Sequence, residues 1–186
     1  AIRAVKHEVA LRFIEARSEL LWLHAGAVAN DHGALLCPGP WGAGKSSLIT
    51  ALYRKGWQYL SDELVPINMH THTATAYPLT PTTRGKSRTT GPASDYLAPP
   101  RIVTPVNEDA ICTAPAPVQA IVFPRYTTEG ENVPVRMSPA AVAVELIKHC
   151  QNIEHHKQTG VKALCKLAEN VDGFSLPFSD VDQAAH

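Results

Sequence analysis

The amino-acid sequence predicts a protein of the α/β class, with a mixed central sheet flanked by helices. Short apolar runs bounded by turn residues alternate with segments whose apolar residues recur at helical spacing. A glycine-rich turn at residues 39–46 joins one such run to one such helical segment. The chain of 186 residues is long enough to bury a core, and we expect a single domain over residues 1–186.

The first part of the chain predicts an amphipathic helix followed by a β-hairpin. Apolar residues at helical spacing, with charged residues between them, predict a helix over roughly residues 3–19. Residues 21–28 then form an apolar run, and residues 34–37 form a second one. The turn sequence Asn30-Asp31-His32-Gly33 lies between them, so the two runs are expected to pair as a hairpin.

Another helix and another strand region follow the glycine-rich turn. Apolar side chains at helical spacing predict a helix over residues 46–55, which Gly56 ends. Residues 57–67 predict further strand structure, and the acidic pair Asp62-Glu63 lies within it.

Residues 71–118 differ in composition from the rest of the chain. They contain eight prolines and ten threonines, which cannot sustain long helices. We expect short strands and ordered loops here, with residues 83–100 forming a mobile lid.

The last third returns to regular structure. Residues 133–137 are expected to pair with the strand that precedes them. Ser138 is expected to cap a helix that Pro139 begins. The expected elements are strands at 118–123, 133–137 and 174–178, and helices at 139–150 and 159–170.

Charge and hydropathy exclude several classes of protein. Lysine and arginine together number 17, as do aspartate and glutamate, so the formal net charge is zero. This balance argues against a broad nucleic-acid or anionic-membrane surface. No apolar run approaches the roughly 18–20 residues of a membrane helix.

Cysteine and histidine give no metal signature. The four cysteines are scattered, and we interpret them as buried free thiols in a reducing cytoplasm: Cys37, Cys112, Cys150 and Cys165. His149, His155 and His156 are interpreted as a polar helix end and a solvated loop rather than as metal ligands.

The glycine-rich turn carries the strongest chemical signal. It fits G-x-x-x-x-G-K-[ST] at every fixed position, between a short apolar strand and a helical pattern. Glycines let backbone N–H groups approach a polyphosphate, the lysine charge contacts the β- and γ-phosphates, and the serine hydroxyl can ligate Mg²⁺. We therefore predict a site for ATP or GTP with Mg²⁺. Its residues are Gly39, Pro40, Trp41, Gly42, Ala43, Gly44, Lys45, Ser46 and Ser47.

The acidic pair and a histidine are further candidates. Phosphoryl transfer needs a carboxylate for the metal and often another for the acceptor proton. Asp62 and Glu63 are adjacent on a strand and so point to opposite faces unless a bulge intervenes. Either one is catalytic and the other structural, or the two form an exposed acidic pair at a strand end. His24, on a strand expected beside the loop, is either a satisfied core group or a site residue.

Three segments together resemble the HPr kinase/phosphorylase superfamily, which is related to the P-loop phosphoenolpyruvate carboxykinases. They are Leu23-His24-Ala25-Gly26-Ala27-Val28, the glycine-rich turn and residues 56–63. The match covers residues 22–67 and extends to compact HPr-kinase-like proteins of ribosomal-peptide pathways, such as lasso peptides. It implies a mixed sheet around a phosphate loop, with Asp62 as general base or acid, His24 beside the phosphates and Glu63 near the metal.

The sequence departs from this family at two points. Glu63 stands where the family has a second aspartate. Thr82-Thr83-Arg84-Gly85 only echoes the family signature E-x-R-G-x-G, which weakens the expectation of HPr as the substrate and of phosphorolysis.

Four basic residues beyond the turn are candidates for a clamp on the phosphates. Arg84, Lys86 and Arg88 cluster in the proline- and threonine-rich stretch, and Arg125 ends a predicted strand. Either they contact a transferring phosphoryl group or they are solvated.

These features favour a Mg²⁺-dependent kinase that transfers the terminal phosphate of a nucleoside triphosphate to a Ser/Thr hydroxyl of a peptide or small protein. In this hypothesis Lys45, Asp62 and His24 act in catalysis, and Ser46, Asp62 and Glu63 serve the metal. The alternative is a nucleotide-binding regulatory or scaffold protein with little transfer. A carboxykinase would need a longer chain. The resemblance also allows a homo-oligomer.

Overall fold

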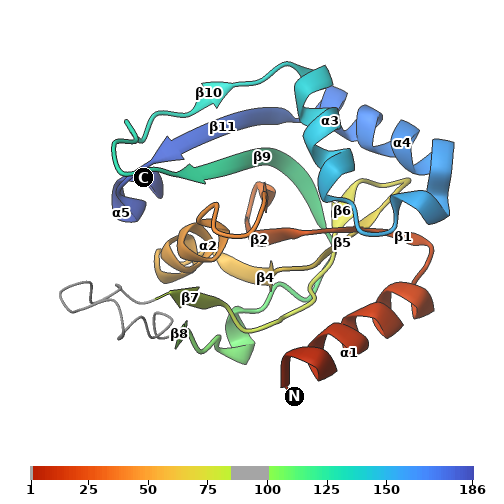
Figure 1. Cartoon of the computed structure of the whole chain (residues 1–186), viewed down its shortest axis with the longest axis horizontal. Coiled ribbons are helices and arrows are strands. Elements are labelled where there is room, and N and C mark those ends of the chain that lie inside the picture. The colour runs from red at the N-terminus through yellow and green to blue at the C-terminus, as the bar shows by residue number, and fades with distance from the viewer. Residues whose placement is uncertain (1, 85–100) are drawn as a thin grey trace, which may run out of the picture.

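The structure, a computed structural model, describes residues 2–84 and 101–186 (Figure 1). It shows a mixed α/β architecture in which a curled mixed sheet carries helices on both faces. The expected lid over residues 83–100 lies almost wholly outside the described residues.

The large sheet contains parallel and antiparallel pairs. Its main path runs β1-β5-β6-β9-β3-β2-β4, and β11 and then β10 extend it beyond β9. β3, β9 and β11 are mutually parallel, whereas the β2–β3 hairpin and the β2–β4 pair are antiparallel. The strands are β1 (Leu20–Leu23), β2 (Ala25–Asn30), β3 (Gly33–Pro38), β4 (Gln58–Asp62), β5 (Val65–Asn68), β6 (Thr73–Ala74), β9 (Ala116–Tyr126), β10 (Val135–Arg136) and β11 (Asp172–Phe178). A separate two-stranded ribbon pairs β7 (Thr82–Arg84) with β8 (Arg101–Val103).

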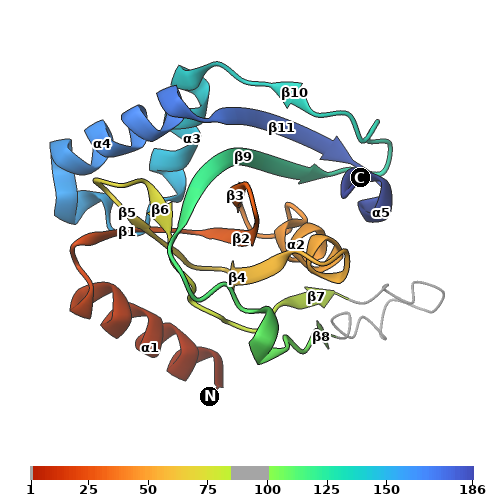
Figure 2. The same ribbon diagram turned by 180° about the vertical axis from the view of Figure 1, so that it is seen from behind.

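Helices cover the sheet on both faces (Figures 1 and 2). Leu48 and Ile49 of α2 pack in one core with Phe178, and Leu146 of α3 packs with Leu164 of α4 in another. α1 covers the end of the sheet at β1. The helices are α1 (Ile2–Ala16), α2 (Lys45–Arg54), α3 (Pro139–His149), α4 (Ile153–Asn170) and α5 (Val181–Ala184), with a 3-10 turn at Glu108–Ala110. No helix among the described residues has the length and apolar character that crossing a membrane requires.

Several local expectations are confirmed. The hairpin forms with the expected turn, and Gly56 follows α2 in the left-handed conformation at φ 95°. Ser138 caps α3, because its Oγ accepts a hydrogen bond from the Ala141 N–H at 3.3 Å, and Pro139 is the first helical residue. The four cysteines are free thiols, three of them buried.

Two expectations about the strands are wrong in detail. The run over residues 21–28 forms two strands, because His24 belongs to neither of them. Residues 133–137 do not pair with β9, because β11 lies between and pairs with both strands. The helix expected over residues 159–170 is confirmed, and a further helical turn from Ile153 precedes it across a kink at Lys157, where φ is 49°.

Candidate functional site

The glycine-rich turn connects β3 to α2 with a backbone that requires glycine at two positions. Gly42 and Gly44 have φ values of 88° and 98°, in the region that side chains disfavour. A Cβ at Gly44 would also lie 2.4 Å from Cζ of Phe178. Gly39, in contrast, does not adopt a positive φ.

The N-terminus of α2 directs backbone N–H groups into this turn. The first bond of the helix runs from the Leu48 N–H to the Gly44 carbonyl at 3.0 Å. Within the described part of the chain, the amides of Lys45 and Ser46 have no hydrogen-bond acceptor. Together with the helix dipole, they form a positive surface suited to an anion.

The Lys45 ammonium is buried beneath the turn and uses all three of its N–H groups. It donates to the carbonyl oxygens of Gly39 at 2.7 Å and Pro40 at 3.1 Å, and to Nε2 of His24 at 3.1 Å. Burial lowers the pKa of Lys45, an effect that the nearby carboxylates of Asp62 and Glu63 oppose.

His24 is fixed in one tautomer by its two partners. Lysine has only donors, so Nε2 of His24 must accept and the ring proton must lie on Nδ1. Nδ1–H then donates to the Glu63 carbonyl oxygen at 3.0 Å. Burial and the Lys45 charge lower the pKa of His24, so the imidazole is neutral at pH 7.

Asp62 lies across the turn from Lys45, at the end of β4. Its Oδ1 accepts a hydrogen bond from the Ser46 hydroxyl at 3.0 Å. The residue is only 3% exposed, and burial raises its pKa to about 6, although the Ser46 hydroxyl and the Thr82 backbone lower it. A buried carboxyl that titrates near neutrality is typical of functional sites.

Glu63 follows Asp62 but faces solvent. Its φ of 93° breaks the strand between β4 and β5 and leaves the side chain exposed while Asp62 is buried. The two carboxylates differ in exposure because of this positive φ and not because of strand alternation, and both act electrostatically on Lys45. Glu63 contributes its carbonyl to His24, and its carboxylate affects Lys45 electrostatically.

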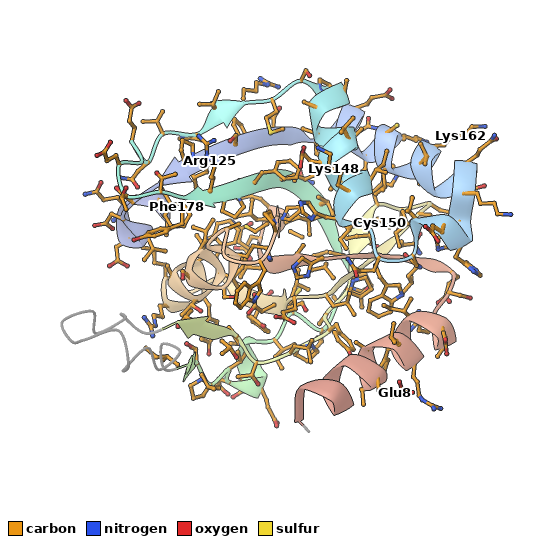
Figure 3. The ribbon with its side chains drawn as sticks, in the orientation of Figure 1. Glu8, Arg125, Lys148, Cys150, Lys162 and Phe178 are labelled. Carbon is orange, nitrogen blue, oxygen red and sulfur yellow. The ribbon has the colours of Figure 1, made fainter. Side chains whose placement is uncertain are left out.

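Of the four basic residues expected to contact the phosphates, the structure describes the side chain of Arg125. Arg84 ends β7, the strand whose Thr82 contacts Asp62, but its side chain, like Lys86 and Arg88, lies outside the described part of the chain. Arg125 is exposed near the carboxyl end of β9 (Figure 3). Among the described residues its side chain makes no hydrogen bond or ion pair, and a contact with the phosphates stays a prediction.

The structure adds His149, which sequence reasoning treated as a polar helix end. It is the last residue of α3, and its carbonyl accepts from the His24 N–H at 2.7 Å. The two rings lie 6.4 Å apart, and the side chain is 14% exposed. Burial, followed by His24, lowers its pKa, while Glu145 at 4.0 Å acts against this. The sequence held no signal that His149 lies beside His24, because the two histidines are 125 positions apart.

All these groups meet at one edge of the sheet. β3 and β4 end there, and β2 begins there, since Ala25 pairs with Pro38 and Gly26 with Asp62. In α/β proteins ligands bind at the carboxyl ends of strands in this way.

The side-chain oxygens at this edge of the sheet are suitable ligands for a hard cation such as Mg²⁺ that is also bound to a phosphate. No cluster of three or more histidine, cysteine, aspartate or glutamate side chains that would suit a metal occurs among the described residues. Ser46 and Asp62 nevertheless place a hydroxyl and a carboxylate 3.0 Å apart. Mg²⁺ commonly binds through one or two such groups and completes its shell with water and phosphate oxygens.

Comparison with known proteins gives a structural likeness. No family model and no curated protein matches the sequence. The chain is similar to the solved structure of the Hpr(Ser) kinase/phosphatase from Coxiella burnetii, with a TM-score of 0.41 and 13% identity, covering 84% of this chain and 79% of that chain. What the site does has to be argued from its own geometry.

Proposed function

We propose that this protein is a Mg²⁺-dependent kinase that transfers the terminal phosphate of ATP or GTP to a Ser/Thr hydroxyl of a peptide or small protein. The observation that carries this proposal is the buried Asp62 carboxyl, held 3.0 Å from the Ser46 hydroxyl directly after the loop lysine. A site that only binds anions has no need for a buried carboxylate in that position.

The loop residues hold the phosphates. The Lys45 ammonium contacts two neutral carbonyls and a neutral imidazole, and a phosphate oxygen is a stronger, charge-assisted acceptor than any of them. The lysine therefore exchanges some of these partners for the β- and γ-phosphates. The amides at the start of α2 supply further donors.

Ser46 and Asp62 are the residues that would hold Mg²⁺. When bound, the ion neutralises charge on the transferring phosphoryl group. Neither residue needs to leave its place, because the hydroxyl and the carboxylate already face one another.

Asp62 is also placed to take the acceptor proton. The acceptor oxygen bonds to the γ-phosphorus, the bond from that phosphorus to the β,γ-bridging oxygen breaks, and the hydroxyl proton passes to a carboxylate oxygen. With no metal bound, its pKa of about 6 leaves Asp62 largely ionised at pH 7, so it can accept a proton where it is not itself the metal ligand. If Asp62 only binds the metal, Glu63 takes the acceptor proton, and if Asp62 only takes the proton, Glu63 binds the metal.

The neutral His24 connects the lysine to the backbone carbonyl of Glu63. Its Nδ1–H is held by the Glu63 carbonyl, so its Nε2 lone pair stays directed at Lys45. This keeps the ammonium at the loop and adds no second positive charge there.

The test is phosphate transfer from γ-labelled ATP and GTP, with Mg²⁺, to a library of Ser/Thr peptides. We expect the wild type to label a peptide hydroxyl and Lys45→Ala to lose that labelling. Lys162→Ala, an exposed lysine on α4, is the matched control and should retain it. Tight nucleotide binding without labelled peptide would instead support a nucleotide-binding regulatory or scaffold protein.

The roles of the two carboxylates separate in the same assay. If Asp62→Asn keeps Mg²⁺-nucleotide affinity and loses transfer, Asp62 serves the acceptor proton. If it abolishes Mg²⁺-nucleotide binding while Glu63→Gln spares it, Asp62 is the metal ligand and the base role passes to Glu63.

A further inference from the structure

An exposed aromatic residue borders the glycine-rich turn on the side away from Asp62. Tyr126 is the last residue of β9, and its N–H donates to the Ala43 carbonyl at 3.0 Å. It is 57% exposed. In the sheet, β3 lies between β9 on one side and β2 and β4 on the other, so Tyr126 and Asp62 flank the loop from opposite sides.

The ring of Tyr126 is held in place. It makes a T-shaped contact with Phe178, with ring centroids 5.7 Å apart and planes at 70°. A Cβ at Gly44 would lie 3.5 Å from the Tyr126 Cβ, so the tyrosine borders the loop where it enters α2. The tyrosine therefore presents a fixed aromatic surface next to the loop amides.

The polarity of a bound nucleotide follows from the position of the reacting groups. The terminal phosphate has to face Asp62 and His24, so the nucleoside leaves the loop in the opposite direction. That direction leads to the carboxyl ends of β9 and β11, which lie at the same edge as the end of β3 because the three strands are parallel. Figure 3 labels Arg125 and Phe178 at these two strand ends.

We propose that the Tyr126 ring is the platform on which the nucleobase stacks. This proposal rests on the proposed nucleotide-dependent function and specifies how the same site holds the base. Stacking on an aromatic ring tolerates any base, because every base has a π-face. We therefore expect ATP and GTP to bind with similar affinity, in keeping with a sequence that carries no motif for reading a base.

The test compares ligands with and without a base. Calorimetry measures the dissociation constants of Mg²⁺-ATP, Mg²⁺-GTP and Mg²⁺-tripolyphosphate for the wild type, Tyr126→Ala and Tyr126→Phe. Val135→Ala, on β10 and also 57% exposed, is the control for loss of an exposed apolar side chain. Aromatic stacking on a base is typically lost in an alanine variant with a change of about tenfold in affinity.

The proposal expects Tyr126→Ala to weaken both nucleotides about tenfold and to leave tripolyphosphate unchanged, while Tyr126→Phe and Val135→Ala match the wild type. Equal weakening of all three ligands would overturn it, because Tyr126 would then support the loop rather than the base. Unchanged nucleotide affinity in Tyr126→Ala would also overturn it. If the wild type binds neither nucleotide nor tripolyphosphate, the proposed function itself fails, and the platform fails with it.

Discussion

Replacing Asp62 by asparagine should stabilise the folded protein at neutral pH while it reduces phosphate transfer. The carboxylate is buried, and its pKa of about 6 lies above the ordinary 3.8. This difference corresponds to about 3 kcal/mol of unfolding free energy, at 1.36 kcal/mol per pKa unit. Asparagine has nearly the same shape and carries no charge to desolvate. The Ser46 hydroxyl can turn to accept from the new amide, so that hydrogen bond is kept.

The sign of the pH dependence follows from proton binding. Below about pH 3.8 the carboxyl is protonated in both states and costs nothing. Between that pH and about 6 the folded state holds a proton that the unfolded chain has lost, so wild-type stability falls as pH rises. Above pH 6 both states are ionised and the full cost remains. The advantage of Asp62→Asn should therefore grow from near zero at pH 4 to about 3 kcal/mol at pH 7.

Urea unfolding of the wild type and Asp62→Asn, measured at intervals from pH 4 to 7, tests this reasoning. Glu63→Gln is the matched control, since that carboxylate is exposed and its removal should change stability less. Transfer by Asp62→Asn, measured at pH 7, should fall by about 10² to 10⁴ if the carboxylate acts as the base. A stability difference that stays constant from pH 4 to 7 would refute the idea that Asp62 is a desolvated carboxylate.

Three further substitutions test the loop and the contacts that support it. Gly44→Ala should destabilise the fold by about 2 kcal/mol or more in urea unfolding, because of its positive φ and the collision with Phe178. Gly42 has a similar φ but no neighbour within 4 Å, so an equal loss of unfolding free energy in Gly42→Ala would contradict the role of that collision. Lys45→Ala should weaken Mg²⁺-ATP binding at least tenfold in calorimetry, and wild-type affinity would reject the phosphate role of the loop. Asn152→Ala should lower the unfolding free energy by about 2 kcal/mol, because this buried side chain satisfies two backbone groups of β1. If the loss of unfolding free energy is smaller than that caused by replacing an exposed polar residue, these two hydrogen bonds do not stabilise β1.

The sequence determined the local parts of the site. The glycines at 42 and 44 adopt positive φ values, and Lys45 begins the helix that the pattern predicts. These features depend on dihedral angles and on neighbours a few residues away, so the local sequence contains the information. The cap of Ser138 on α3 was predictable for the same reason.

The partners of those residues were decided by the tertiary structure. Periodicity shows that a strand has a buried face, but it does not say which strand lies beside it. β11 therefore took the place at β9 that the sequence assigned to β10. The break at His24, which turns its imidazole toward Lys45, depends on a backbone bond from α3.

The chemical character of the site likewise needed the folded chain. The Ser46 hydroxyl meets the Asp62 carboxylate only because α2 and β4 pack against each other, and burial there raises the carboxyl pKa to about 6. His149 reaches His24, and Tyr126 reaches the loop, from elements that lie far away in the sequence. A motif fixes which groups are available, whereas the dielectric around them and the distances between them come from packing between distant segments.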